Sequence, residues 1–166
     1  MPLFLTSFQR LNQYEHLVDV AVSVSRFQPK GFSLPEISAL AAKDETGGKL
    51  LLRQFTHNPL HGYRKALYRG YKKRWPAVKQ WMLDLDESSM VAIVCWCPYS
   101  RATRNQLRLY GTSACHTGLI ARMVQNKRPD ITILLDRDHF KLVPEWCPEN
   151  YGLLNKDGSV IKPMFM

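Results

Sequence analysis

The chain has 166 residues, 45% of them hydrophobic, and a formal net charge of +9. This length and apolar content predict one domain with a substantial hydrophobic core. No apolar run of about eighteen residues is present, which excludes a membrane-spanning segment, so we expect no membrane partner. The first residues lack the basic start and the cleavage site of a signal peptide, and we therefore expect a cytoplasmic protein.

The first half of the chain predicts two strands and then helices. Residues 3–7 and 17–25 are rich in β-favouring side chains, and in the second segment valines alternate with small or polar residues. Ser33 is the predicted cap of a helix that begins near Pro35 and ends at Gly47-Gly48. A further helix is predicted over about residues 61–75. Its core-facing stripe recurs every four residues and consists of Tyr63, Leu67, Tyr71 and Trp75.

The second half predicts further alternation of helices and strands. Pro76 starts another helix, residues 90–95 form an apolar run typical of a strand covered on both faces, and residues 130–136 predict a further strand. Beyond residue 136 the chain is irregular, with a hairpin predicted around residues 155–158. We therefore expect an α/β fold: a single Rossmann-like three-layer domain over residues 1–166 with a mostly parallel sheet. Its core is predicted at about residues 1–140, followed by an irregular C-terminal extension at about 141–166.

The positive charge is concentrated in two segments. Residues 64–79 contain seven basic side chains and no acidic one, and residues 88–129 form a second span without acidic residues. Such clustering is typical of proteins that bind a polyanion, although basic surfaces also occur simply for solubility. We predict a nucleic acid or a phosphate-bearing nucleotide as the partner, while a protein partner stays open. The predicted nucleic-acid-binding residues are Arg64, Lys65, Arg69, Lys72, Lys73 and Arg74.

Chemistry-bearing residues are concentrated just after the predicted strand at residues 90–95. A turn and helix cap at residues 111–113 place Cys115 and His116 in the first turn of a helix, where backbone N–H groups and the helix dipole favour an anion or a thiolate. The carboxyl ends of parallel strands are where open α/β sheets bind ligands. We therefore predict a ligand or phosphate site at this edge. Its residues are Ser7, Arg26, Arg101, Arg104, Thr112 and Ser113.

Several landmarks of this chain occur in the same order in a known family. Thr6-Ser7 ends the first strand, and the second strand runs into an Arg-x-x-Pro turn that begins at Arg26. Residues 95–97 read Cys-Trp-Cys and residues 115–117 read Cys-His-Thr, where the family has Cys-x-Glu and Cys-His-Arg. In this order the chain resembles the YeaO-like family, also called domain of unknown function 488. The resemblance implies a compact Rossmann-like α/β domain and implies little about a reaction. Cys97 stands in the place of the family's glutamate, and Thr117 in the place of its arginine.

Three interpretations of the cysteine-rich segment stay open. In the first, Cys115 is a catalytic thiolate with His116, His57, His61 or His139 as its base and backbone N–H groups as the anion hole, and Cys97 is a further catalytic candidate in the place of the family's glutamate. Cys115 and His116 cannot easily pair with each other, because consecutive helical residues point about 100° apart. In the second, Zn²⁺ is bound by Cys95, Cys97, Cys115 and His116. In the third, Cys95 and Cys147 are inert core thiols and the helix start simply holds a phosphate.

These observations predict a nucleic-acid- or nucleotide-associated α/β protein. One form of the hypothesis is an enzyme that processes a nucleic acid or nucleotide at a Cys-His site. The alternatives are a non-enzymatic protein that binds a nucleic acid or nucleotide, and a zinc-binding interaction module. Zinc is the only cofactor that the residues indicate, through the four-ligand set of the second interpretation.

Overall fold

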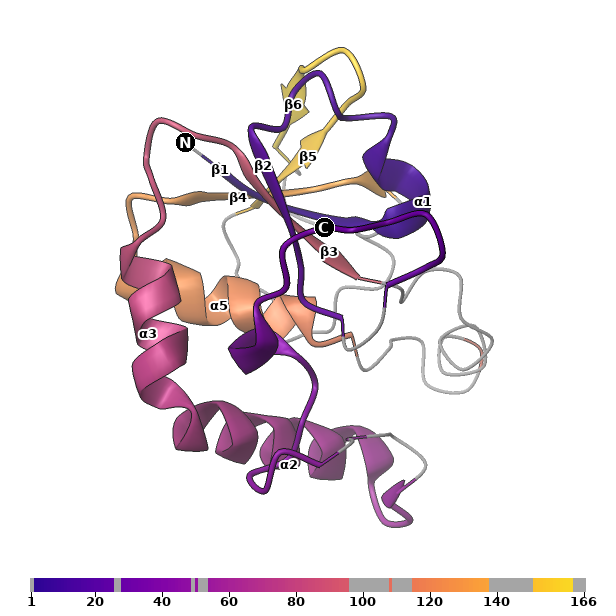
Figure 1. Cartoon of the computed structure of the whole chain (residues 1–166), viewed down its shortest axis with the longest axis vertical. Coiled ribbons are helices and arrows are strands. Elements are labelled where there is room, and N and C mark those ends of the chain that lie inside the picture. The colour runs from indigo at the N-terminus through magenta and orange to yellow at the C-terminus, as the bar shows by residue number, and fades with distance from the viewer. Residues whose placement is uncertain are drawn as a thin grey trace.

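A computed structural model of the protein describes residues 2–25, 28–48, 50, 54–95, 108, 115–137 and 151–162. In these residues six strands form one sheet, in the order β2-β3-β1-β4-β5-β6 (Figure 1). All neighbouring pairs are parallel except β5 and β6. The predicted α/β class with a mostly parallel sheet is therefore confirmed. The strands are β1 Pro2–Ser7, β2 Val20–Ser23, β3 Val91–Cys95, β4 Thr132–Leu135, β5 Tyr151–Leu154 and β6 Val160–Ile161.

Helices cover both faces of the sheet, as Figure 1 shows. The long helices α2, α3 and α5 lie on one face and the short helix α1 lies on the other. Side chains of β1 alternate between the two faces, because Leu5 joins the core under the long helices while Phe4 joins the core under α1. The helices are α1 Phe8–Leu11, the 3-10 helix η1 Ser38–Leu40, α2 Pro59–Lys73, α3 Trp75–Leu83 and α5 Thr117–Lys127.

The strand order determines which residues meet at the carboxyl edge of the sheet. β1 lies between β3 and β4, with Ser7 in register with Cys95 and Leu5 in register with Leu135. In the classical Rossmann order β2 is next to β1, whereas here β3 takes that place and β2 is an edge strand. A Rossmann-like arrangement thus stays a prediction, while the carboxyl ends of β1, β3 and β4 share one edge.

The predicted helix from Ser33 to Gly47 is wrong. Only η1 is helical in this segment, and the residues before it run extended along the edge strand β2. The backbone N of Ser23 donates to the Pro35 carbonyl at 2.8 Å, and the N of Ile37 donates to the Ser23 carbonyl at 3.0 Å. These hydrogen bonds satisfy the open side of β2. A tertiary partner therefore outweighed the local capping signal at Ser33.

Helix α2 agrees with three of the four residues of its predicted stripe. Tyr63, Leu67 and Tyr71 are buried against the core of the sheet, whereas Trp75 begins α3 and is partly buried against the same core. Gly70 is also buried and faces the loop at residues 39–44, where a Cβ atom would collide with the Lys43 carbonyl oxygen. The absence of a side chain at Gly70 thus permits the close approach of helix and loop.

The C-terminal hairpin is confirmed, and it joins the main sheet. β5 and β6 pair antiparallel, and Gly158 occupies their turn at φ 89°, a left-handed conformation that favours glycine. β5 also pairs parallel with β4. The residues of the two strands, 151–154 and 160–161, therefore belong to the sheet and not to the irregular extension that the sequence predicted.

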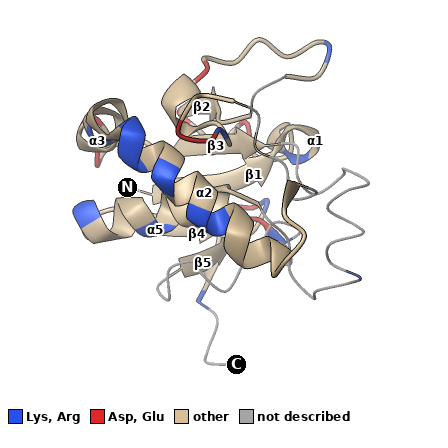
Figure 2. Ribbon diagram, turned by 90° about the horizontal axis from the view of Figure 1, so that it is seen from below, with Lys and Arg blue, Asp and Glu red and all other residues tan. Residues whose placement is uncertain are grey.

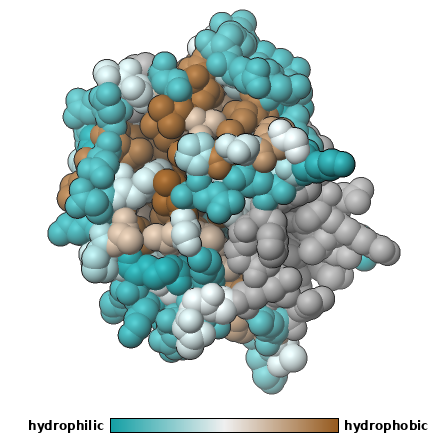
Figure 3. Space-filling view, in the orientation of Figure 1, coloured by the Kyte–Doolittle hydropathy of each residue, from teal (hydrophilic) through white to brown (hydrophobic). Residues whose placement is uncertain are grey.

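The surface seen in Figure 3 divides into two parts. Apolar side chains gather over the sheet in the upper half, whereas the lower part, where α2 lies, is mostly hydrophilic. Among the described helices, none has both the length and the apolar character that a bilayer span requires.

Candidate functional site

The carboxyl edge of the sheet contains a pair of buried polar side chains. Thr6 is the last but one residue of β1 and faces the α1 side, and Asp136 directly follows β4. The Thr6 hydroxyl donates to an Asp136 carboxylate oxygen at 2.6 Å, and both side chains are fully buried. The short distance is typical of a hydrogen bond that a carboxylate accepts. This hydrogen bond therefore connects β1 to the end of β4 at the edge where the sequence predicts a ligand or catalytic site.

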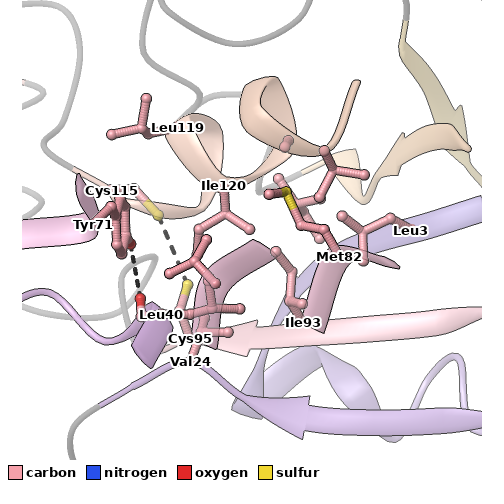
Figure 4. Close-up of a cluster of buried hydrophobic side chains, with 14 of the residues drawn as sticks. Leu3, Val24, Leu40, Tyr71, Met82, Ile93, Cys95, Cys115, Leu119 and Ile120 are labelled. Atoms are coloured by element: carbon pink, nitrogen blue, oxygen red, sulfur yellow. Dashed lines mark hydrogen bonds between the residues drawn. The ribbon is translucent and has the colours of Figure 1, made fainter. Parts of the chain in front are cut away.

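Cys95 and Cys115 meet at the same edge, on the face covered by α5 (Figure 4). Their sulfurs lie 3.9 Å apart, and the two residues are 0% and 2% exposed. The Cys115 sulfur also lies 3.0 Å from the Thr117 hydroxyl. Figure 4 shows both sulfurs among core side chains that include Ile93 and Ile120. The predicted burial of Cys95 is thus confirmed, and Cys115 is buried beside it.

The His116 side chain is hydrogen-bonded to the residue that directly follows β2. Its Nε2 lies 2.8 Å from the Val24 carbonyl oxygen, and the side chain is 6% exposed. Because a carbonyl can only accept a hydrogen bond, Nε2 carries the proton. Helix α5 begins at Thr117, with His116 as its N-cap, so Cys115 precedes the helix and does not lie in its first turn as predicted. The first backbone bond of the helix runs from Ile120 N to the His116 carbonyl, and this bond defines the later start.

Ser7 lies beside these thiols. It is fully buried, and its Oγ has no hydrogen-bond partner in the part of the chain that the structure describes. Ser7 is in register with Cys95 on the adjacent strand, so both side chains point toward the α5 face. A buried hydroxyl without a partner costs about 1–3 kcal/mol. Ser7 is therefore the described side chain at this edge that best fits the predicted role of ligand binding.

The remaining predicted residues of the edge cannot be placed. Cys97, Arg26, Arg101, Arg104, Thr112 and Ser113 lie outside the described residues, as do Cys147 and His139. In the described ranges no group of three His, Cys, Asp or Glu side chains has an arrangement that could hold a metal ion. The Zn²⁺ hypothesis thus keeps its four predicted ligands as a prediction, with the Nε2 of His116 already bound to Val24.

A second candidate site is the space between helices α2 and α5. One section of it, of about 400 Å³, is continuous with another of about 540 Å³, because Tyr68, Met123 and Asn126 line both. We call this space the α2–α5 groove. Its further lining residues are His61, Arg64, Lys65, Tyr71, Lys72, Trp75, Leu119, Arg122 and Lys127.

The charged side chains that line the α2–α5 groove are all positive in the part of the chain that the structure describes. Five of these lining side chains are cations, and none is a carboxylate. Neither α2 nor α5 contains an acidic residue, and Figure 2 shows basic bands on both helices. The cations of the groove are Arg64, Lys65 and Lys72 from α2, and Arg122 and Lys127 from α5.

The six basic residues predicted to bind nucleic acid divide into three groups. Arg64, Lys65 and Lys72 line the groove. Arg69 and Lys73 are exposed and do not line it, and Arg74 forms the third group.

Arg74, the last of the predicted basic residues, has an internal role. Its guanidinium donates to the backbone carbonyls of Ala39, Ala41, Lys43 and Asp44 at 2.9–3.3 Å. Partial burial lowers the pKa of Arg74 from its ordinary value. Its donors are directed at the loop, so Arg74 fastens the end of α2 to residues 39–44.

Sequence reasoning missed half of the groove. Tyr68, Met123 and the α5 cations were not predicted as site residues, because the partner face of a helix depends on tertiary packing. A local signal does exist on α2. Arg64, Tyr68 and Lys72 recur every four residues and so share one row on the helix surface.

No protein-family model matches this chain, and neither the curated proteins nor the solved structures contain a match. The resemblance to the YeaO-like family therefore stays a prediction that rests on the residues quoted above.

Proposed function

We propose that this protein binds nucleic acid through the α2–α5 groove. The observation that carries the proposal is a continuous groove to which the described residues contribute five cationic side chains and no acidic one. Phosphate contacts by Lys and Arg dominate the affinity of proteins for nucleic acids. The groove extends over two sections, which suits a polymer of phosphates better than a single phosphate group.

The proposed contacts carry little sequence information. Lysine and arginine side chains that contact phosphates set affinity and position, whereas sequence is read at base edges in the grooves of the nucleic acid. The described part of α2 and α5 has the cations without a recognisable base-reading motif. Binding is therefore expected to depend strongly on salt and weakly on sequence.

A second hypothesis keeps the Cys-His site as an enzyme centre that acts on the bound nucleic acid. The unpartnered Ser7 hydroxyl beside Cys95 and Cys115 supports it. Cys115→Ser separates the two hypotheses, because it leaves the groove unchanged. If Cys115→Ser abolished an activity on the nucleic acid and left the affinity unchanged, the protein would be an enzyme. A non-enzymatic binding protein would show no such activity in the wild type and the same affinity in the variant.

The proposal is tested by a fluorescence-anisotropy titration of labelled DNA and RNA at several salt concentrations. The first variant combines Lys72→Glu with Arg122→Glu, one from each wall of the groove. We expect the affinity to fall at least about tenfold. The slope of log affinity against log salt concentration should also become shallower, by the equivalent of about two phosphate contacts.

The matched control combines Lys73→Glu with Lys79→Glu, which changes the net charge by the same amount at exposed positions that do not line the groove. We expect the control to keep most of the affinity. Equal losses in the two variants would reject the groove as the site. Negligible binding by the wild type at low salt would reject nucleic acid as the partner.

A further inference from the structure

The α2–α5 groove contains an exposed aromatic ring that phosphate binding does not require. Tyr68 is 53% exposed, and it lines both sections of the groove. Arg64 and Lys72 lie one helical turn before and after it on the same row of α2. The ring is therefore flanked by a cation on each side.

The opposite wall is apolar at its base and cationic at its rim. Leu119 and Met123 are four residues apart on α5, and both line the groove, as does Arg122. The thioether of methionine packs well against flat aromatic groups. A flat ring that entered the groove beside Tyr68 would thus meet polarizable and apolar side chains as well as cations.

One end of the groove already shows an aromatic ring paired with a cation. The Nζ of Lys127 lies 5.6 Å from the centre of the Trp75 ring, and both residues line the groove. Trp75 is partly buried and packs against the core, so part of its ring is not accessible to a ligand. Tyr68 is left as the exposed aromatic surface that the groove offers to a ligand.

We propose that the groove is specific for single-stranded nucleic acid, with a base stacked on Tyr68 and the adjoining phosphates on the exposed cations Lys65, Lys72 and Arg122. This inference rests on the proposed function. Alternating cations and aromatic rings are how proteins bind single strands without sequence preference, because every base has a flat face. A duplex keeps those faces inside its base stack, and an acidic peptide has the charge without the flat faces.

The test measures the affinity of the protein for three labelled probes by fluorescence anisotropy at fixed salt. The probes are a single-stranded oligothymidine of about twelve nucleotides, an abasic strand of the same length, and a duplex of the same length. The wild type is expected to bind the oligothymidine about tenfold more tightly than the abasic strand, because one stacked base accounts for that factor. This comparison needs no variant.

Tyr68→Ala is expected to weaken oligothymidine binding about tenfold, to the level of the abasic strand, and Tyr68→Phe is expected to keep the wild-type affinity. Equal wild-type affinity for oligothymidine and the abasic strand would overturn the inference, as would tighter binding of the duplex or unchanged binding by Tyr68→Ala. If polyglutamate bound as tightly as oligothymidine, the partner would be an acidic protein and the inference would fail. In the first three cases the charge-reversal result still decides the proposed function separately, whereas equal binding of polyglutamate would also reject nucleic acid as the partner.

Discussion

The carboxyl edge of the sheet and the α2–α5 groove both contain residues that bind or react, but they differ in accessibility. Cys95, Cys115 and His116 are buried, and each has a partner within the chain. Tyr68 and Arg122 are exposed in an open groove. Reactive residue types at a sheet edge are thus insufficient to locate a binding surface, because packing decides whether a ligand reaches them.

The largest expected effect separates the two faces of α2. Leu67 is fully buried and Tyr68, the next residue, is 53% exposed. Leu67→Ala should lower the free energy of unfolding by about 3 kcal/mol through lost burial and a cavity, and Tyr68→Ala should change it by less than about 0.5 kcal/mol. Urea unfolding followed by circular dichroism measures both. Similar losses in the two variants would show that Tyr68 belongs to the core and not to a ligand surface.

Arg74 and Arg69 sharpen the distinction between internal and surface cations. Arg74 donates to four backbone carbonyls, whereas Arg69 is exposed. Arg74→Ala should destabilise the fold by about 2 kcal/mol, because four partly buried carbonyls lose a charged donor, and Arg69→Ala should have almost no effect. Thermal unfolding of both variants tests this. If the Arg74→Ala protein were as stable as the wild type but bound nucleic acid more weakly, Arg74 would be a nucleic-acid contact, as the sequence predicted.

The extent to which the sequence predicts the structure differs between these elements. The stripe of Tyr63, Leu67 and Tyr71 predicts both α2 and its buried face, because helical periodicity is a local property. The same local reasoning placed Arg74 among the nucleic-acid contacts, since nothing nearby in the sequence shows that residues 39–44 present their carbonyls to it. The extended course of residues 35–37 along β2 and the pairing of β5 with β4 likewise depend on contacts between distant segments.

The candidate sites also combine features that local sequence patterns predict with features that depend on contacts between distant segments. The sequence correctly placed Cys95 at the end of a buried strand, and Arg64, Lys65 and Lys72 on the polar side of α2. It did not reveal that α5 forms the opposite wall of a groove. That wall is defined by Met123 and Arg122 only once both helices pack on the same face of the sheet.

A smaller effect distinguishes a buried histidine from an exposed one. His116 donates to the Val24 carbonyl, and His61 lies exposed at the rim of the groove. His116→Leu should lower the free energy of unfolding by about 1 kcal/mol, because leucine cannot donate to the Val24 carbonyl, with almost no change for His61→Leu. Chemical denaturation provides the comparison. An unchanged His116→Leu protein would leave the imidazole available for catalysis.

The smallest effect concerns acid. The hydrogen bond from Arg128 lowers the pKa of Asp130, and the Thr46 hydroxyl lowers the pKa of Asp44, both from an ordinary value of 3.8. A lowered pKa in the folded state stabilises the fold above the unfolded value, and this stabilisation is lost as the pH falls through the folded value. The melting temperature should therefore decrease below about pH 4, and less steeply in Asp130→Asn and Asp44→Asn. Neither carboxylate lines the groove, so nucleic-acid binding above that pH should be the same in these variants.

The position of the bound strand decides between the two regions most directly. Ultraviolet cross-linking of the wild-type protein to a single-stranded oligothymidine, followed by proteolysis and mass spectrometry, identifies the residues that contact the bases. We expect adducts on the peptides that contain Tyr68 of α2 and Met123 of α5, two of the three side chains shared by both sections of the groove. Adducts on the peptides of Ser7, Cys95 or Cys115, with none on α2 or α5, would contradict this account and assign the ligand to the carboxyl edge of the sheet.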